Sequence, residues 1–216
     1  MPARRDSQDG YVTRQMNISA VLLAGGESRR MSKDKATLLF RGKPLWQIQL
    51  ELLRQLEPAE IFISARTDPI WRPAEVQFVA DDPPSRGPLS GLAASLARMR
   101  TKHLLALAID MPFMTEKYLR FLYDQIEPGH GVLPKIDKPE MIGVYENFRS
   151  RAEPLAAIYP REVDVDFRSA LSGIDFSLQP LTNRLVQAGK LRTVSVPDEA
   201  KKFFLNLNSA TDLQPK

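Results

Sequence analysis

A glycine pair followed by a run of cations is the feature of this chain with the clearest chemical meaning. Gly25 and Gly26 follow the apolar segment 18–24, and the next nine positions hold four cationic side chains: Arg29, Arg30, Lys33 and Lys35. Glycines at the end of a sheet strand let the backbone approach a ligand closely, and lysine and arginine neutralise phosphate charge. The segment has neither the spacing of a Walker A loop nor that of a G-x-G-x-x-G turn. It indicates a phosphate-binding loop, although a tight turn with solvated charges would have the same composition.

A carboxylate follows a second apolar segment. Asp110 comes directly after residues 103–109, and Pro112 restrains the turn that it begins. In open α/β sheets, ligands bind outside the carboxyl ends of the strands. A carboxylate placed there can hold Mg²⁺ against phosphate oxygens. We therefore single out Asp110 as a metal ligand; the alternative is that it only caps the turn.

Two further polar segments accompany these residues. The loop 81–91 follows an apolar run and contains Asp81, whose carboxylate can accept hydrogen bonds from a base or a sugar. Its density of proline and glycine fixes its path. Near the end of the chain, Asn206 and Asn208 are two residues apart, which places both amides on one face if that segment is a strand. There they could reach a metal or a ligand.

The elements that must position these residues alternate between strands and helices. Short apolar runs predict buried strands at 18–24, 60–64, 76–80 and 103–109, with further strand character at 155–159, 193–196 and 203–207. Helical spacing or capping predicts helices at 89–99, 163–171 and 180–188. It also predicts one helix that begins at 43–44 and one that begins after Thr115. The segment 128–147 is rich in proline, glycine and charge, and we expect it to be irregular. This alternation predicts an α/β fold with a mainly parallel central sheet flanked by helices.

Composition narrows the function classes. The 216 residues are 43% hydrophobic and include no cysteine and two histidines, which excludes a disulfide scaffold and a thiolate nucleophile. The net charge of +4 is spread along the chain, unlike the basic tracts of nucleic-acid-binding proteins. No apolar run reaches the ~18 residues of a membrane span, and the start lacks a signal peptide's apolar stretch. We expect a cytoplasmic protein in which 1–16 form a loosely attached extension and 17–216 form a single domain.

Taken in order, the motifs resemble those of the molybdenum cofactor guanylyltransferases, a family of MobA-like nucleotidyltransferases. The resemblance covers residues 18–214 and rests on LAGGESRRMSKDK (23–35), the loop Asp81…Gly87-Pro88-Leu89-Ser90-Gly91, Asp110-Met111-Pro112-Phe113, Glu153-Pro154-Leu155 and FLNLNSATDL (204–213). Related cytidylyltransferases usually have Leu-Ala-Ala-Gly at 23–26, so the glycine pair favours guanine. The chain departs from the family at Ser32, where glycine is usual, at Ser64, where some members have asparagine, and in a longer segment 134–151.

The resemblance implies a Rossmann-like nucleotidyltransferase fold whose N-terminal half binds the nucleotide and whose C-terminal half binds molybdopterin. It implies transfer of GMP from GTP to the molybdenum–molybdopterin cofactor, with release of pyrophosphate. Lys35, Arg30 and Asp110 would be catalytic, and Mg²⁺ would bind Asp110 with Asn206 or Asn208 as an assistant. GTP would contact the backbone of Leu23, Ala24 and Gly25, the Asp81 carboxylate, and Gly87, Pro88 and Leu89 around the base. Partners would be limited to these substrates and to transient contacts with cofactor biosynthesis proteins or acceptor enzymes, without nucleic acid or membrane.

Three other functions remain compatible with the sequence. A cytidylyltransferase or a sugar-phosphate nucleotidyltransferase would use the same fold and chemistry on another substrate. A non-catalytic nucleotide-binding module would keep the fold but would not need Lys35 and Asp110 intact. A nucleic-acid-binding protein is disfavoured by the dispersed charge.

Overall fold

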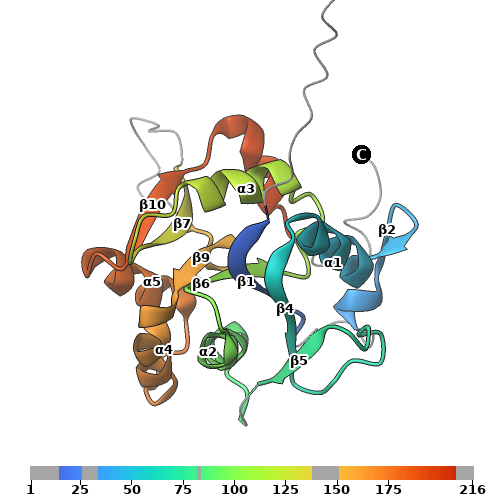
Figure 1. The fold of residues 1–216 in the computed structure, drawn as a ribbon, viewed down its shortest axis with the longest axis horizontal. Helices are drawn as coiled ribbons and strands as arrows, with labels where there is room; N and C mark the ends of the chain where they lie inside the picture. The colour runs from blue at the N-terminus through green and yellow to red at the C-terminus, as the bar shows by residue number, and fades with distance from the viewer. Residues whose placement is uncertain (1–14, 26–33, 82–83, 138–150, 208–216) are drawn as a thin grey trace, which may run out of the picture.

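A central sheet with helices on both faces makes up the computed structural model, which describes residues 15–25, 34–81, 84–137 and 151–207 (Figure 1). The sheet strands are β1 (Met16–Leu23), β4 (Pro58–Ala65), β5 (Gln77–Ala80), β6 (His103–Ala108), β7 (Gly131–Ile136), β8 (Arg151–Ala152), β9 (Ile158–Pro160) and β10 (Leu191–Ser195). The helices are α1 (Leu45–Gln55), α2 (Pro88–Arg98), α3 (Glu116–Asp124), α4 (Asp164–Leu171) and α5 (Leu178–Gln187). Short elements complete the fold: the hairpin of β2 (Leu39–Phe40) and β3 (Lys43–Pro44), and the 3₁₀ turns η1 (Lys35–Thr37), η2 (Pro154–Ala156), η3 (Arg161–Val163) and η4 (Asp198–Phe204).

The strand order is β10-β7-β9-β6-β1-β4-β5, and β8 pairs with β7. The pairs β1–β4, β1–β6, β4–β5 and β7–β10 are parallel, whereas β9 runs antiparallel to both of its neighbours. Figure 1 shows α1 and α3 on one face of the sheet and α2, α4 and α5 on the other. The predicted α/β fold with a mainly parallel sheet is therefore confirmed. Within the described ranges, no helix is long and apolar enough to cross a membrane.

Strand β1 lies inside the sheet, between β4 and β6, and is buried on both faces. Ile18, Ala20 and Leu22 pack into the hydrophobic cluster on the side of α1 and α3, while Val21 and Leu23 pack into the cluster on the side of α2, α4 and α5. A strand covered on both faces cannot alternate apolar and polar side chains, which explains the apolar run from Ala20 to Leu23. Met16, which we assigned to the N-terminal extension, is the first residue of β1 and is fully buried. The expected boundary between the extension and the domain was therefore placed too late, because Met16 belongs to the sheet.

The expected irregular segment 128–147 contains a strand. β7 has the unpromising sequence GVLPKI, but Val132 and Leu133 are fully buried. Gly131 is needed there because a Cβ at this position would lie 2.3 Å from the carbonyl oxygen of Ile158 in β9. Pairing with β9 and β10 thus outweighs the low strand propensity of proline and glycine. Residues 138–147 of the expected segment lie outside the described ranges.

The prediction of a C-terminal strand at 203–207 is also wrong. Residues 198–204 form η4, whose Phe204 ring packs edge-on against Tyr118 of α3 at a centroid distance of 5.4 Å. Asn206 therefore follows a 3₁₀ turn instead of lying on a strand, and Asn208 is outside the described ranges. The strand expected at 155–159 divides in the same way into η2 and β9. Aromatic and aliphatic residues suit these turns because their side chains fill the space beside α3 and β6.

Helix α2 approaches the carboxyl ends of β1 and β4 closely because Gly91 has no side chain. A Cβ at this position would lie 2.4 Å from the Ser64 hydroxyl, 3.0 Å from Leu23 Cδ2 and 3.3 Å from Asp81 Oδ1. Helix α2 itself begins after Gly87, at a positive φ of 67°, with Pro88 in its first turn. This arrangement places the start of α2 against the carboxyl edge of the sheet.

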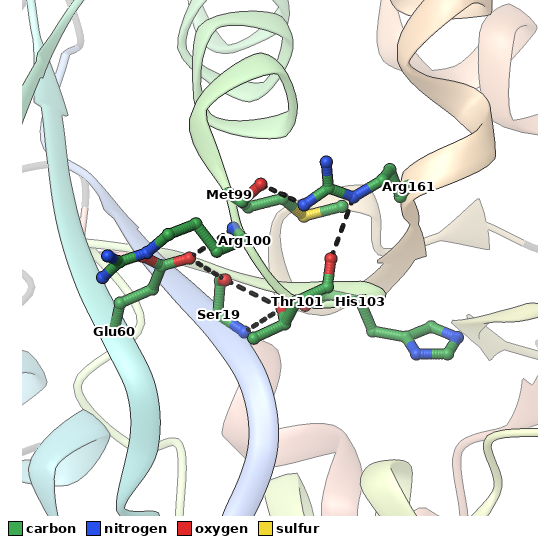
Figure 2. Close-up of polar contacts among 7 residues, drawn as sticks. All are labelled: Ser19, Glu60, Met99, Arg100, Thr101, His103 and Arg161. Carbon is green, nitrogen blue, oxygen red and sulfur yellow. Dashed lines mark hydrogen bonds and ion pairs between the residues drawn. The ribbon is translucent and has the colours of Figure 1, made fainter.

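At the opposite edge of the sheet, the amino edge, a buried carboxylate connects neighbouring segments (Figure 2). Glu60 of β4 accepts hydrogen bonds from the Ser19 hydroxyl at 2.6 Å, from the Arg100 backbone N–H at 2.7 Å and from the Arg100 guanidinium at 3.0 Å. Thr101 bonds the Ser19 hydroxyl and the Ser19 N–H, both at 2.8 Å. Burial raises the pKa of Glu60, but these donors outweigh it, and the pKa lies below its ordinary value of 4.5. The network therefore ties β1 and β4 to the segment that enters β6.

We predict that Gly91→Ala destabilises the fold. The added methyl group would collide with Ser64 and Leu23 at the helix–sheet contact, and overpacking of this kind costs about 1–3 kcal/mol. That exceeds the ~0.4–1 kcal/mol that alanine gains by restricting the unfolded chain. Denaturant unfolding of the single variants and of Ser64→Ala/Gly91→Ala tests the cause. Without the Ser64 hydroxyl, the same methyl should cost less than it does in the wild-type background, and an equal cost would contradict the proposed contact.

We predict that Glu60→Gln lowers stability by about 1.5–3 kcal/mol at neutral pH, because a buried charge-assisted network loses an acceptor. Since the pKa is lowered in the folded state, the carboxylate's contribution is full above its ordinary value of 4.5 and is lost as pH falls through the folded value. The difference between wild type and variant, measured by urea unfolding, should therefore shrink on acidification. Glu51→Gln is the control, because Glu51 also accepts from two side chains, Lys43 and Gln47, but at the surface. If Glu51→Gln lowered stability more than Glu60→Gln does, the structural role given to Glu60 would be contradicted.

Candidate functional site

The strand order places a topological switch point between β1 and β6, and we call the carboxyl edge of the sheet at this point the crevice. After β1 the chain forms α1 and then β4, which pairs with one edge of β1. Later it forms α2 on the opposite face of the sheet and then β6, which pairs with the other edge of β1. Connections that leave a parallel sheet in opposite directions cannot fill the space between two such strands, and ligands bind at that point. The residues after Leu23 and after Ala108 therefore face the same crevice at the carboxyl edge.

Lys35 and Asp110 meet at this edge. The Lys35 ammonium donates to Asp110 Oδ2 at 3.1 Å, across 75 positions of sequence. Their side chains are 20% and 18% exposed, so the pair is shielded but still accessible from solvent. Lys35 is the first residue of η1, and Asp110 comes two residues after the end of β6. The structure thus brings together two of the three residues predicted to be catalytic; the third, Arg30, lies outside the described residues.

The backbone next to Asn206 contacts Asp110. The Leu207 N–H donates to the Asp110 carbonyl at 2.9 Å, which fixes the end of the described chain against the crevice. The Asn206 side-chain oxygen is buried and finds no hydrogen-bond donor among the described residues. A buried acceptor without a donor is costly, and such atoms often have a ligand. Asn206 was singled out for a position on a strand, which was wrong, although the next residue, Leu207, does contact Asp110.

Asp81 is buried at the neighbouring position of the same edge. Its Oδ1 accepts from the Ser64 hydroxyl at 2.9 Å and its Oδ2 from the Ser85 hydroxyl at 2.8 Å. Ser64, the departure from the family pattern, therefore holds the Asp81 carboxylate. A Cβ on Gly25 would lie 3.2 Å from Asp81 Oδ2, so the first glycine of the pair packs directly against this carboxylate.

The other predicted nucleotide contacts are partly engaged within the fold. The Leu23 carbonyl accepts from the Ile109 N–H at 3.2 Å, and the Ala24 N–H donates to the Ser64 carbonyl at 2.9 Å. The Leu89 side chain is 1% exposed and belongs to the core under α2. Leu23, Ala24 and Leu89 therefore shape the crevice more than they present free polar groups, whereas Gly87 and Pro88 form the turn at its rim.

Residues that sequence reasoning did not assign also line this edge. A hollow of about 200 Å³ beside Gly25 is lined by Ala24, Gly25, Asp34, Ala65, Arg66, Thr67, Pro69 and Trp71. Asp34 directly precedes Lys35 and caps η1. A short polar residue before a helical turn is a capping signal, so the sequence could have indicated this role. A larger hollow of about 750 Å³ lies at the amino edge, near Asn17 and Arg100, away from Lys35 and Asp110. Its size does not mark it as the site, because ligands of such sheets bind at the carboxyl edge.

Glu153, from the fourth motif, is a buried carboxylate on the far side of β6. Its N–H donates to the carbonyl of Pro134 in β7 at 2.9 Å, and Arg151 lies 3.4 Å from its Oε1. Burial raises the pKa of Glu153, and Arg151 offsets this only in part. Among the described residues, no group of three or more histidine, cysteine or acidic side chains could hold a metal ion by itself.

Solved structures share this fold. Molybdopterin-guanine dinucleotide biosynthesis protein A from Archaeoglobus fulgidus superposes with a TM-score of 0.71 at 24% identity, over 91% of this chain and 95% of the other. The 4-diphosphocytidyl-2C-methyl-D-erythritol synthase from Anaerococcus prevotii superposes with a TM-score of 0.69 at 13% identity, over 91% of this chain and 92% of the other. At these identities the likeness concerns the fold alone.

Sequence comparisons identify the family. A probable molybdenum cofactor guanylyltransferase from Opitutus terrae is 31% identical over 198 residues, which are 90% of this chain and 92% of that protein. A protein of the same description from Methanosarcina acetivorans is 27% identical over 93% of this chain and 90% of its own length. The family model for the MobA-like NTP transferase domain matches residues 20–186, which include Lys35, Asp81 and Asp110. The chain therefore belongs to the MobA-like NTP transferase family.

Proposed function

We propose that this protein transfers GMP from GTP to the terminal phosphate of the molybdenum–molybdopterin cofactor. The observation that carries the proposal is the Lys35–Asp110 pair, in which a cation and a carboxylate 3.1 Å apart share the crevice between β1 and β6. The similarity to probable guanylyltransferases over nine-tenths of the chain supports the choice of substrates. The products would be molybdopterin guanine dinucleotide and pyrophosphate.

The reaction joins two anions, which defines what the protein must supply. An oxygen of the acceptor phosphate forms a bond to the α-phosphorus of GTP, and the bond from that phosphorus to the bridging oxygen breaks, releasing pyrophosphate. The attacking and leaving groups are both negative, so catalysis depends on positioning and on positive charge instead of a protein nucleophile. Lys35 would exchange Asp110 for phosphate oxygens and follow their charge into the transition state. Arg30, from the same loop, would add a second cation.

The residues beside the pair fit a magnesium ion. Mg²⁺ is usually bound through one or two protein oxygens together with substrate phosphates. The Asp110 carboxylate and the Asn206 side-chain oxygen, which has no donor among the described residues, are oxygen donors of this kind. These two residues would hold the ion, with Asn208 as a further candidate. When bound, Mg²⁺ would neutralise triphosphate charge and stabilise the negative charge that develops on the leaving group.

The guanosine end would lie on the side of Asp81. This carboxylate and Gly25 form one wall, and Gly87 and Pro88 at the start of α2 form the rim. Guanine presents N–H donors at N1 and N2 that a carboxylate or a backbone carbonyl of this loop could accept. The C-terminal half, with Glu153 buried between β7 and η2, would receive the pterin. Reaction in the cytoplasm and transient contact with other cofactor proteins stay predictions.

Product analysis is the direct test. The protein would be incubated with Mg²⁺, molybdenum cofactor and GTP, CTP or ATP in parallel, and the dinucleotide and pyrophosphate measured. A cytidine product would establish a cytidylyltransferase, and transfer to a sugar phosphate in place of the cofactor would establish a sugar-phosphate nucleotidyltransferase. Nucleotide binding without pyrophosphate release would leave the non-catalytic module as the function.

We predict that Asp110→Ala reduces turnover by about 100-fold or more, because it removes a metal ligand whose ion stabilises developing charge. Lys35→Ala should weaken GTP binding and turnover together, since the ammonium would act in both states. The melting temperature of both variants should change little, because a partly exposed ion pair contributes about 0–1 kcal/mol. Lys33→Ala, which removes a neighbouring cation, is the control. If Lys33→Ala is more harmful than Lys35→Ala, the loop has been assigned incorrectly.

We predict that GTP stabilises the protein more than CTP or ATP does. A site that hydrogen-bonds one base leaves polar groups unpaired with another, at about 1–3 kcal/mol for each buried group. The preference should appear as a difference in thermal shift at equal nucleotide concentration with Mg²⁺ present. Gly25→Ala should reduce the preference for GTP over CTP, because the added methyl group would lie 3.2 Å from Asp81 Oδ2 and displace it. Equal shifts with CTP and GTP in the wild-type protein would refute the guanine preference.

A further inference from the structure

Lys35 begins a very short element. η1 contains three residues, and a single 3₁₀ turn is marginal by itself because its few hydrogen bonds barely offset the entropy of ordering it. Long lysine side chains also lose considerable freedom when they are fixed. The position of the Lys35 ammonium in the crevice therefore depends on what anchors η1 to the rest of the domain.

Asp34 is one such anchor, and both of its carboxylate oxygens are used. Oδ1 accepts from the Ala36 N–H at 3.0 Å, which closes the first turn of η1. Oδ2 accepts from the indole N–H of Trp71 at 2.9 Å. The Asp34 carbonyl accepts from the Thr37 N–H at 3.0 Å and from the Thr37 hydroxyl at 2.9 Å. Asp34 thus connects η1 to a tryptophan that lies 37 positions away in the sequence.

Trp71 is in turn fixed to helix α1. Its ring stacks on Trp46, with centroids 5.4 Å apart and an interplanar angle of 16°. Both rings pack against the hydrophobic cluster on the side of α1 and α3. On the other side of Lys35, Ala36 is fully buried in the same cluster. The two neighbours of Lys35 are therefore both held, one through the indole N–H and the other by burial.

This anchor matters most when the crevice is occupied. Lys35 donates to Asp110 in the structure, but on the proposed function it must give up that contact to reach phosphate oxygens. Once it does so, the contact with Asp110 no longer contributes to its position, and the anchors of its backbone become more important. The Asp34–Trp71 hydrogen bond involves neither Asp110 nor the phosphates, so it persists through the exchange.

We propose that Trp71 is a positioning residue for Lys35: its indole N–H, held by stacking on Trp46, fixes the Asp34 cap and so the Lys35 ammonium in the phosphate subsite. The proposal rests on the proposed function for the identity of the phosphate ligand. It does not depend on which base or which acceptor the protein uses.

The test compares Trp71→Phe with Trp46→Phe. Both variants keep an aromatic ring in the stack, but only the first removes the N–H that binds Asp34. We expect Trp71→Phe to weaken binding of inorganic tripolyphosphate and to lower the turnover number, each by roughly tenfold or more. Hydrogen exchange of the amides of residues 36–38 should accelerate in the same variant. Trp46→Phe should change none of these, and both variants should melt at similar temperatures.

Asp34→Asn provides the coupled measurement. The two donors bind different oxygens of Asp34, and asparagine has an NH₂ group in place of one of them. That NH₂ group would face either the Ala36 N–H or the Trp71 N–H, so the link between the two would break and the variant should show the same losses. In Asp34→Asn/Trp71→Phe the second substitution should then add little, which is the signature of one shared interaction. Equal tripolyphosphate affinity and equal exchange in Trp71→Phe and Trp46→Phe, or full additivity with Asp34→Asn, would overturn the proposal. A wild-type protein that binds tripolyphosphate but transfers no guanylyl group would refute the proposed function instead, while the binding and exchange results would still decide the role of Trp71.

Discussion

Strand β1 is hydrogen-bonded to β4 on one edge and to β6 on the other, and it is buried on both faces. Because all three strands run parallel, the loops that follow them leave from the same edge. Gly25, Ala65 and Asp110 are consequently neighbours, although the sequence separates them by dozens of residues. A charge in the interior of this sheet would be costly, so the polar groups of these segments lie where the strands end. The site is thus a consequence of the burial of β1.

The polar groups at the two edges of the sheet differ in how fully they are hydrogen-bonded. At the amino edge, Glu60 is buried and receives three hydrogen bonds, so that its charge is well compensated. At the carboxyl edge, the Lys35–Asp110 pair is partly exposed, and the Asn206 oxygen has no donor within the described residues. A saturated network stabilises a fold, whereas partly satisfied groups retain capacity for a ligand. This contrast distinguishes a structural carboxylate from one suited to binding, even though the cavity beside the first is the larger.

How far the sequence could predict the structure depended on where each segment's partners lie. The apolar runs of β1 and β6 required burial on both faces, and this alone located Gly25 and Asp110 at one edge. β7 was missed because Gly131 and Pro134 suit a sheet only when β9 and β10 are already beside them. The segment around Asn206 was misjudged because its aromatic residues pack against Tyr118 instead of forming a strand. Trp71 could not have been assigned, since its contact with Asp34 exists only in three dimensions.

The glycine pair acquires a more specific meaning from the structure. From the sequence, the glycine pair was expected to let the backbone approach a ligand closely and to favour guanine. In the structure a methyl group added to Gly25 would point toward Asp81 Oδ2, 3.2 Å away, and would not extend into open space. Asp81 is itself held by Ser64 and Ser85, and Ser64 also limits the space around Gly91. A methyl at residue 25 would therefore act on the base through the orientation of this carboxylate, within a cluster that has little freedom to adjust. On the proposed function, the difference between Leu-Ala-Gly-Gly and the Leu-Ala-Ala-Gly of related cytidylyltransferases would then be electrostatic as much as steric, because it would alter where the Asp81 carboxylate meets the base.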